Sequence, residues 1–438
     1  MATNQTLDYD ALVVGGGIAG LQAALDLADQ DYRVAIVERD ASIGGKMIRL
    51  SKVFPTLDCA SCITTPKMAA AAHHPNITLY TYAEVRAIGA AAEGAGFRAD
   101  LTLKARFVDQ NRCIGCRQCE YHCPVLVPDM EQGGFSARKA IYIPFSNAIP
   151  QIALLDSEHC MLCGQCEKVC PTGAIAYQQQ PQALVLNARA VILTTGFEVM
   201  PLADKQQYGN GRIPNVITAL QMERLLAPHG PYNRVLRPSD GMEPGSIAYI
   251  QCAGSRDQSM GQAYCSRVCC MYAIKQAMLL SGALPLADIT VYYMDIRAFG
   301  KGYEQFYQNS RAMGIQFIKG KVATLGAGPD GAVAVRYEAQ EAEGGSVSAS
   351  HDLVVLSLGL TPGWNPEPVC GVSRASDGFI KTVRPKTAAT LTDHEGVFVA
   401  GAAAGPKDIV DTIAEAGAAA MEAAVYLARK QPRRQAAA

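Results

Sequence analysis

The hydrophobic pattern near the start of the chain predicts a strand, a turn, a helix and a second strand. An apolar run at residues 9–14 is followed by a glycine-rich segment at residues 15–20, and residues 21–29 then carry apolar positions at helical spacing. A second apolar run at residues 33–38 ends in an acidic residue. This order is typical of the first half of a dinucleotide-binding Rossmann unit.

Further apolar runs extend this pattern along the chain, at residues 188–196, 246–250, 289–293, 352–359 and 396–401, and residues 409–429 form a helical pattern. Strands that alternate with helices favour α/β domains with largely parallel sheets. From residue 109 to about residue 180 the sequence is instead rich in cysteine and proline and has little periodicity, which indicates an inserted domain.

The predicted domain organisation follows from these changes in pattern. We expect a Rossmann-type domain in three pieces, an insertion, and a second α/β region resembling a nicotinamide domain, with the pieces at 1–108, 181–245 and 366–438, the insertion at 109–180 and the second region at 246–365. A chain of 438 residues is long enough for two or three domains, each with its own core.

Composition argues against nucleic acid and membrane partners. The chain has a net charge of −1 and 18% charged residues, so it lacks the excess of basic residues that nucleic acid or anionic lipid would attract. Apolar stretches are shorter than a membrane span, and the first residues do not resemble a signal peptide. We therefore expect a cytoplasmic protein that touches a membrane only through partner subunits.

The glycine-rich turn has the spacing of a dinucleotide fingerprint. In Gly15-x-Gly17-x-x-Gly20 the first glycine allows a tight turn, the second lets the backbone approach a diphosphate, and the third lets the helix pack closely on the strand. The diphosphate is expected at the start of the helix, where free N–H groups and the helix dipole favour anions. Glu38 is placed to accept a hydrogen bond from a ribose hydroxyl. A purely structural turn is the alternative for a lone fingerprint.

Three later segments favour FAD over NAD because they resemble the sequence signatures of flavoproteins with two dinucleotide-binding domains. The segments are residues 42–46, which follow the acidic residue, residues 194–196 and residues 397–401. In the last signature Ala402 stands where such proteins usually have an aspartate for the ribityl chain, so Asp408 or Ile409 could contribute nearby. The predicted FAD-binding residues are Gly15, Gly17, Ile18, Ala19, Gly20, Glu38, Arg39, Gly44, Gly45, Lys46, Thr195, Gly196, Gly401 and Ile409.

The 15 cysteines cluster at short spacings, which indicates metal or redox chemistry rather than a disulfide framework. Two copies of C-x-x-C-x-x-C-x-x-x-C-P match the run of bacterial ferredoxins, in which the fourth cysteine binds the other cluster. The motif therefore predicts two [4Fe-4S] clusters, one bound by Cys113, Cys116, Cys119 and Cys170 and the other by Cys160, Cys163, Cys166 and Cys123. The stretch from 133 to 155 exceeds what a minimal ferredoxin needs and is expected to form a docking surface.

A third cysteine group, formed by Cys252, Cys265, Cys269 and Cys270, has no ferredoxin spacing. Four thiols within nineteen residues can converge on one metal centre, and buried structural cysteines are the alternative. This group lies where a nicotinamide domain would have its first strand and turn, and residues 247–255 lack a second glycine fingerprint. The expected NAD(P)H diphosphate site is therefore damaged or absent.

The motif Cys59-x-x-Cys62 follows Gly45 near the place where disulfide-reductase flavoproteins carry a redox-active pair. Three interpretations stay open for it: a redox pair, ligands of another cluster, or a structural role.

Taken together, the chain resembles the flavoprotein A subunits of heterodisulfide reductases and their relatives, which include the A subunit of the quinone-interacting membrane-bound oxidoreductase and sulfur-oxidation proteins. The segments that carry this resemblance are residues 54–62, 137–142, 251–257, 264–272 and 401–411. It implies a thioredoxin/glutathione reductase-like α/β flavoprotein with an inserted two-cluster ferredoxin domain, and a third [4Fe-4S] cluster in the unusual cysteine group. The resemblance also places Lys275 near the isoalloxazine. From the sequence alone, a single lysine on a helix would be interpreted as a solvated surface charge.

The resemblance implies an oxidoreductase. It would be the FAD and iron–sulfur electron-transfer subunit of a heterodisulfide-reductase-like or quinone-interacting complex, with the other subunits of that complex as its partners and a homodimer as an open alternative. A different function would be that of a self-contained NAD(P)H-dependent disulfide reductase in which Cys59 and Cys62 are catalytic. Another is an electron relay whose flavin meets no free substrate.

Overall fold

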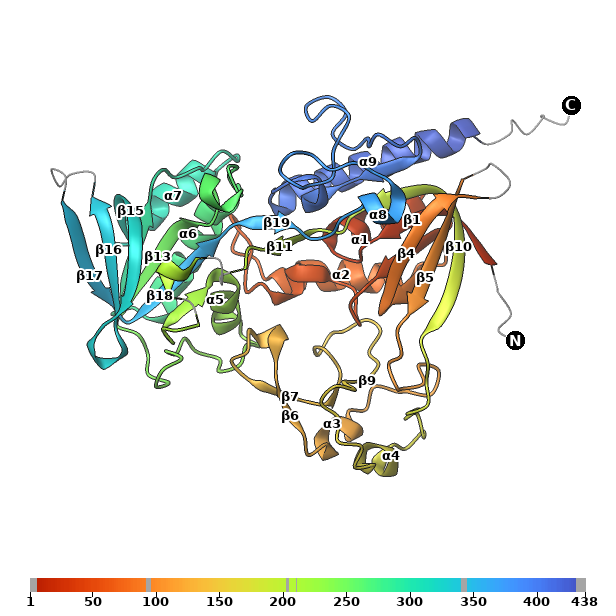
Figure 1. Cartoon of the computed structure of the whole chain (residues 1–438), viewed down its shortest axis with the longest axis horizontal. Helices are drawn as coiled ribbons and strands as arrows, with labels where there is room; N and C mark the ends of the chain where they lie inside the picture. The colour runs from red at the N-terminus through yellow and green to blue at the C-terminus, as the bar shows by residue number, and fades with distance from the viewer. Residues whose placement is uncertain (1–5, 92–95, 202–204, 210, 340–344, 431–438) are drawn as a thin grey trace, which may run out of the picture.

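The structure, a computed structural model, describes residues 6–91, 96–201, 205–209, 211–339 and 345–430. Two α/β units lie side by side, and the cysteine-rich insertion packs below the seam between them in the view of Figure 1. The N-terminal strands and the C-terminal helix belong to the same unit, so the chain leaves this unit for the insertion and again for the second sheet before it returns.

The first unit is built on a seven-stranded sheet within the described residues, with the order β3-β2-β1-β10-β5-β4 and β20 beside β10. Its strands are β1 (Thr6–Val14), β2 (Val34–Glu38), β3 (Ile77–Thr81), β4 (Ala83–Ala90), β5 (Phe97–Leu103), β10 (Gln182–Leu193) and β20 (Val397–Val399). The strands β3, β2, β1, β10 and β20 run parallel, while β5 and β4 add an antiparallel edge. The predicted parallel core is therefore present, with a hairpin at one edge.

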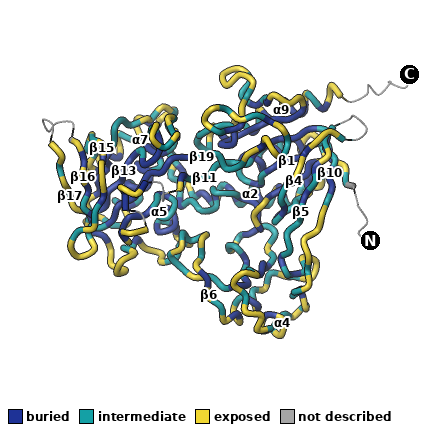
Figure 2. The backbone as a smooth tube through the Cα atoms, viewed as in Figure 1, coloured by how far each residue is buried: buried dark blue, intermediate teal, exposed yellow. Residues whose placement is uncertain are grey.

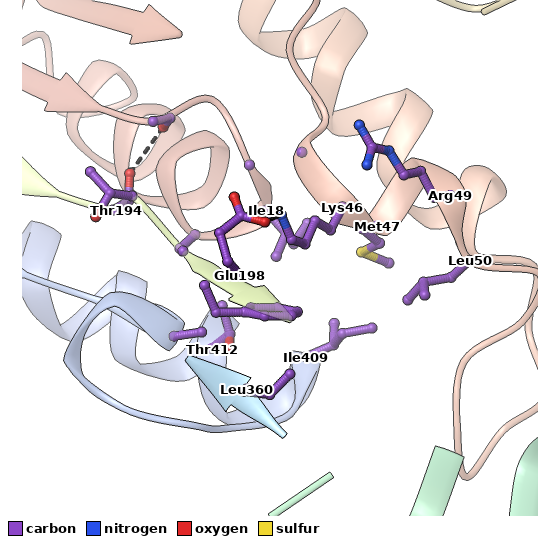
Figure 3. Close-up of a pocket in the computed structure, with 18 of the residues that line it drawn as sticks. Ile18, Lys46, Met47, Arg49, Leu50, Thr194, Glu198, Leu360, Ile409 and Thr412 are labelled. Carbon is purple, nitrogen blue, oxygen red and sulfur yellow. Dashed lines mark hydrogen bonds and ion pairs between the residues drawn. The ribbon is translucent and has the colours of Figure 1, made fainter. Parts of the chain in front are cut away.

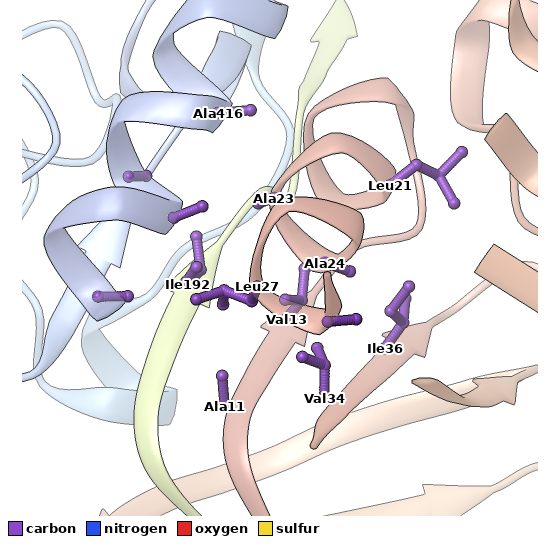
Figure 4. Close-up of a cluster of buried hydrophobic side chains, with 14 of the residues drawn as sticks. Ala11, Val13, Leu21, Ala23, Ala24, Leu27, Val34, Ile36, Ile192 and Ala416 are labelled. Atoms are coloured by element: carbon purple, nitrogen blue, oxygen red, sulfur yellow. The ribbon is translucent and has the colours of Figure 1, made fainter. Parts of the chain in front are cut away.

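Helices α1 (Ile18–Ala28), α2 (Ala60–His73) and α9 (Ile409–Lys430) pack on this sheet. Figure 4 shows α1 and α9 lying next to each other over β1 and β10, with Ala23, Leu27 and Ala416 between them. Alanines dominate the buried face of α9, and small side chains let two helices approach closely. This packing fixes the N-terminus of α9 beside the N-terminus of α1.

The second unit is another seven-stranded sheet within the described residues, with the order β12-β18-β13-β14-β15-β16-β17. Its strands are β12 (Val216–Thr218), β13 (Ser246–Ala253), β14 (Asp288–Tyr293), β15 (Gln316–Ala327), β16 (Val333–Ala339), β17 (Ser346–His351) and β18 (Leu353–Leu358). The first five in that order run parallel, and β16 and β17 extend the sheet antiparallel. Its helices are α5 (Ala219–Leu226), α6 (Cys269–Ala283) and α7 (Tyr303–Ala312).

A short antiparallel ribbon of β11 (Phe197–Val199) and β19 (Leu360–Pro362) connects the two units. After it, α8 (Glu367–Cys370) and residues up to β20 return the chain to the first sheet. Figure 2 shows the buried backbone concentrated in the strands of both sheets and in the helices that cover them.

The insertion contains little regular structure. Its elements are the short helices α3 (Gln118–His122) and α4 (Gln165–Val169) and the two-stranded pairs β6 (Leu126–Pro128) with β7 (Ala137–Lys139) and β8 (Ile141–Tyr142) with β9 (Leu154–Leu155). The apolar residues of the insertion form a cluster of their own that includes cysteines of both ferredoxin motifs.

The segment from 133 to 155, expected to form a docking surface, contacts other parts of the same chain. The Ser42 hydroxyl donates to the Ile149 carbonyl at 3.1 Å, and Gln221 donates its side-chain amide to the Gly133 carbonyl at 3.0 Å. The Asn147 amide donates to the Thr65 hydroxyl at 2.6 Å. These contacts hold the insertion against both α/β units.

The described helices include none long and apolar enough to cross a membrane.

Candidate flavin and iron–sulfur sites

The glycine turn after β1 has the geometry that the fingerprint predicts. Gly15 has φ +110°, and a Cβ there would lie 2.4 Å from the carbonyl oxygen of Thr194, so only glycine fits. A Cβ on Gly20 would lie 1.9 Å from the carbonyl oxygen of Gly15, which shows how closely helix α1 approaches β1. Gly17 differs, because its backbone is extended and a Cβ would have only the Cα of Gly45, at 3.9 Å, within 4 Å.

The N-terminus of α1 is open to an anion. Gly17 is its N-cap, no side chain caps it, and the first turn contains no acidic residue. The first backbone N–H groups of a helix lack partners within the helix, and the helix dipole favours negative charge there. The open space beside Gly17 and this uncapped helix end fit a dinucleotide diphosphate.

A cavity of about 680 Å³ begins at this turn and extends between the two units. Figure 3 shows residues from distant parts of the chain around it: Ile18 from α1, Thr194 after β10, and Ile409 and Thr412 from α9. The predicted FAD-binding residues that line it are Gly15, Gly17, Ile18, Ala19, Glu38, Arg39, Gly45, Lys46, Thr195, Gly196 and Ile409. Asp408 and Ala402 line it as well.

Three predicted FAD-binding residues support the cavity without lining it. Gly20 packs α1 on β1, and the Gly44 N–H donates to the Gly16 carbonyl at 2.8 Å. Gly401, with φ +69°, donates its N–H to Glu415 at 2.7 Å, and a Cβ on it would lie 2.9 Å from the Cβ of Ala19. These glycines shape the wall from behind.

Glu38 ends β2 and is almost fully buried. Its carboxylate accepts the N–H groups of Gly16 at 2.7 Å and Asp40 at 2.8 Å, and burial raises its pKa. A carboxylate has about four lone-pair sites, so a ribose hydroxyl could still donate to it. Glu38 therefore holds the glycine turn in addition to facing the cavity.

Two basic side chains of the cavity share one carboxylate. Glu198 on β11 pairs with Lys46 at 2.8 Å and with Arg39 at 2.5 Å, and the two bases hold the Glu198 pKa below its usual value despite burial. The local sequence pattern does not indicate Glu198, because its partners lie 152 and 159 residues away in the chain.

Lys275 on α6 lines the cavity from the second unit and is fully buried. Its ammonium pairs with the Glu223 carboxylate on α5, which also accepts the N–H of Ser51 at 2.9 Å and its hydroxyl at 2.6 Å. Burial lowers the Lys275 pKa, and the ion pair with Glu223 acts against that shift. A solvated surface charge, the alternative for a lone helical lysine, is therefore wrong.

The ferredoxin cysteines gather into two groups around small cavities. One is lined by Cys113, Cys116, Cys119 and Cys170 and the other by Cys123, Cys160, Cys163 and Cys166. In each motif the chain turns through a left-handed residue, Arg117 or Gly164, into a short helix and leaves it in extended conformation at the fourth cysteine. The fourth cysteine of each motif thus joins the first three of the other.

Among the described residues, the cysteine groups are not compact enough to surround a single zinc ion. Four thiolates at about 2.3 Å from one zinc would lie within about 4 Å of each other. Among the described residues, the one group of His, Cys, Asp and Glu ligand atoms within 4.8 Å of each other is Asp156, Glu158 and His159, which has no cysteine. The two ferredoxin cysteine groups have the donor chemistry of iron–sulfur clusters.

The third cysteine group lies at the carboxyl end of β13 and the start of α6. Cys252 has φ +55° at an irregularity of β13, and Cys269 and Cys270 form the first turn of α6. Burial, with the nearby thiols of Cys252 and Cys265, raises the Cys270 pKa to about 11. Thiolates here would need a positive partner, as a metal centre provides.

This cysteine group shares a wall with the flavin cavity. Val268 and Tyr272, which flank Cys269 and Cys270 in sequence, line the cavity. The carbonyl of Leu358, another lining residue, accepts from the Tyr272 hydroxyl at 3.3 Å and from the Cys269 thiol at 3.7 Å.

Cys59 and Cys62 do not line the cavity. Cys59 is the N-cap of α2, and its sulfur accepts the Cys62 N–H at 3.3 Å. The hydrogen bond from the Cys62 thiol lowers the Cys59 pKa, while Cys62 is exposed. The segment before them reaches the cavity at Lys52, Val53 and Phe54.

Comparison with known proteins agrees with this architecture. A model described as "4Fe-4S dicluster domain" matches residues 112–174, and one described as "NAD(P)-binding Rossmann-like domain" matches residues 13–59. Thioredoxin reductases of T. acidophilum and Lactococcus lactis each superpose with a TM-score of 0.52 at 16% and 15% identity, covering 96% of this chain and 97% and 99% of theirs. These neighbours show the two-dinucleotide-domain fold.

Curated relatives match almost the whole chain. The A subunit of the H(2):CoB-CoM heterodisulfide,ferredoxin reductase of Methanothermobacter marburgensis is 42% identical over 433 residues, which are 98% of this chain. The H(2)/formate:CoB-CoM counterpart of Methanococcus maripaludis is 45% identical over 97% of this chain. The chain belongs to the family of heterodisulfide reductase A subunits. It spans 65% of the length of each of these two family members.

Proposed function

We propose that this chain is an electron-transfer subunit of a heterodisulfide-reductase-like complex and holds FAD and three [4Fe-4S] clusters. When bound, FAD exchanges electrons in pairs and the clusters exchange them singly, so one chain that holds both can convert between the two. The family membership and the dicluster model support the flavin and the ferredoxin clusters. The third cluster, the order of the sites and the partner subunits are our inference.

The observation that carries the proposal is the wall shared by the flavin cavity and the third cysteine group. Val268 and Tyr272 face the cavity, and Cys269 and Cys270 lie between them in sequence. We propose the order FAD, third cluster, ferredoxin clusters and partner, or the reverse. Lys275 on the same helix lines the cavity, and its ammonium, paired with Glu223, would lie near the isoalloxazine.

A self-contained NAD(P)H-dependent disulfide reductase is less well supported. Strand β13 contains Cys252 at its irregular end and leads into Gly254 rather than into a glycine fingerprint, and Cys59 and Cys62 lie outside the cavity wall. Reduction of the isolated protein by NADH or NADPH at steady state would favour this alternative. Activity only after partner subunits are added would favour the electron-transfer role in a complex or a relay.

The proposal predicts bound FAD and about twelve iron atoms per chain, from three four-iron cubes. Replacement of Cys269 and Cys270 by serine should lower the iron content to about eight atoms per chain and leave FAD and both ferredoxin clusters in place. Electron transfer between the flavin and the ferredoxin clusters should then become much slower. Rapid mixing that follows flavin and cluster absorbance separately measures this. Unchanged transfer in a variant shown to lack the third cluster would refute the proposed order.

A further inference from the structure

The outer face of helix α9 is apolar, although the helix lies at the surface of the first unit (Figure 1). Its inner face carries alanines and Leu427, which pack in the core of that unit. On the opposite side, the side chains of Val410, Met421 and Val425 are 59, 52 and 42% exposed. A surface helix usually presents polar residues to water. The apolar outer face therefore indicates a surface that another helix covers.

The exposed apolar positions of α9 form one straight stripe. They recur at intervals of three and four residues, which is the spacing of a coiled-coil seam, at Ala414, Ala418, Met421, Val425 and Ala428. With 3.6 residues per turn, these positions fall within an arc of about 80° on the helix. This spacing favours a partner that is itself a helix and lies along α9.

The order of large and small side chains along the stripe is self-complementary. If a second copy of α9 runs antiparallel so that Met421 faces Ala418 of the partner subunit, the same register places Val425 opposite Ala414 of the partner subunit. Each pair sets a large side chain against a small one, and a two-fold axis makes each contact occur twice. A parallel pair would instead set alanine against alanine and leave gaps.

The charged residues beside the stripe favour the same antiparallel arrangement. Asp411 lies in the first turn of α9 and Arg429 and Lys430 lie in its last turn, and all three are exposed. The register of the apolar pairs places Asp411 beside Arg429 of the partner subunit, whereas a parallel pair would bring like charges together at both ends. Asp411 also pairs with Arg267 of its own chain at 3.0 Å, and 49% of its side chain stays exposed. Glu422 lies at the edge of the stripe, where it keeps contact with water.

We propose that the outer face of α9 is a homodimer interface, in which two copies of the helix pack antiparallel about a two-fold axis. The start of α9 lines the flavin cavity at Ile409 and Thr412. At 1.5 Å per residue, the two helix starts lie about 30 Å apart in this arrangement, so each chain completes its own cavity. The inference does not depend on which redox centres the chain holds.

The test is sedimentation velocity of the whole, cofactor-loaded protein from about 1 to about 100 μM, because a single helix seam is a small interface. We expect a dimer whose dissociation constant rises roughly 100-fold or more in Val425→Glu, since the two-fold axis buries two added carboxylates. The matched control is Leu286→Glu, which changes a leucine that is 98% exposed in the second unit and should leave the dimer unchanged. Wild-type protein that stays monomeric over this range, or a dimer that persists unweakened in Val425→Glu, would overturn the inference.

An exchange of charges tests the antiparallel register. Arg429→Glu should weaken the dimer about tenfold, because it sets acidic side chains against each other twice, and the added Asp411→Lys should restore most of the affinity. A second change that restores nothing would refute the antiparallel seam. Thermal unfolding and flavin content show whether each variant keeps an intact monomer. If Val425→Glu fails this check, Met421→Lys takes its place, and a dimer as tight as the wild type in that variant would equally overturn the inference.

Discussion

Replacement of Gly17 by valine should remove FAD while the protein stays folded. The N-cap φ and ψ of −76° and −175° are ordinary for any residue, and a Cβ would have only the Cα of Gly45 within 4 Å. In the flavin-free protein we expect the free energy of unfolding to change by less than about 1 kcal/mol. Valine is a poorer N-cap than glycine, but it also makes the unfolded chain less flexible, and the two effects offset each other.

The cost appears when the diphosphate binds, because the new side chain occupies the space beside the helix N-terminus. Loss of two charge-assisted hydrogen bonds from backbone N–H groups costs about 3–6 kcal/mol. At about 1.4 kcal/mol for each factor of ten, FAD should bind roughly 10²- to 10⁴-fold more weakly.

The assay is a fluorescence titration of flavin-free protein with FAD, together with thermal unfolding of the same samples. Gly20→Val is the comparison variant, since its Cβ would lie 1.9 Å from the carbonyl oxygen of Gly15 and should prevent folding outright. A folded Gly17→Val protein with wild-type FAD affinity would refute the assignment of the turn to the diphosphate.

Further predictions concern the buried ion pair and the cysteine pair at the start of α2. Lys275→Met should destabilise the protein by about 3–5 kcal/mol, because it leaves Glu223 buried and unpaired. Adding Glu223→Gln should recover most of this loss, as denaturant unfolding can measure. If the double variant is no more stable than Lys275→Met, the buried ion pair is contradicted. Cys59, whose pKa is lowered, should react with iodoacetamide faster than Cys62 near neutral pH, as peptide mass spectrometry can measure, and equal rates would contradict it. Serine at both cysteines should leave the iron content unchanged if they form a redox pair, and a loss of iron would make them cluster ligands.

Local sequence patterns predicted the parts of the site that depend on local geometry. The close packing at Gly20 follows from the fingerprint itself, because a Cβ there would meet the carbonyl of Gly15 in the same turn, whereas Gly15 also meets Thr194 from the distant strand β10. The crossed grouping of the ferredoxin cysteines is likewise built into each motif, since the short helix directs the fourth cysteine away from the first three. The alternation of strands and helices predicted α/β domains with largely parallel sheets, and the family resemblance implied the two-dinucleotide-domain fold.

The charged residues that complete the site were not predictable in this way. Glu198 and Glu223 each meet partners from segments distant in sequence, and nothing in their own neighbourhood distinguishes them from surface charges. Lys275 illustrates the same limit, because a helix position alone gives no measure of burial. Such residues are identified only when the fold brings their partners together.

The two α/β units differ at the same structural position, the start of the helix that follows a central strand. In the first, the helix after the central strand begins at Gly17 with bare N–H groups, which suit a diphosphate. In the second, the helix after β13 begins with Cys269 and Cys270, and Val268 at its N-cap has right-handed backbone. Thiols at that helix end occupy the place where a dinucleotide diphosphate would bind in a doubly wound sheet. Under the proposed function, this difference favours a metal centre over a nicotinamide at the second position, so electrons would pass between the flavin and the chain's own clusters.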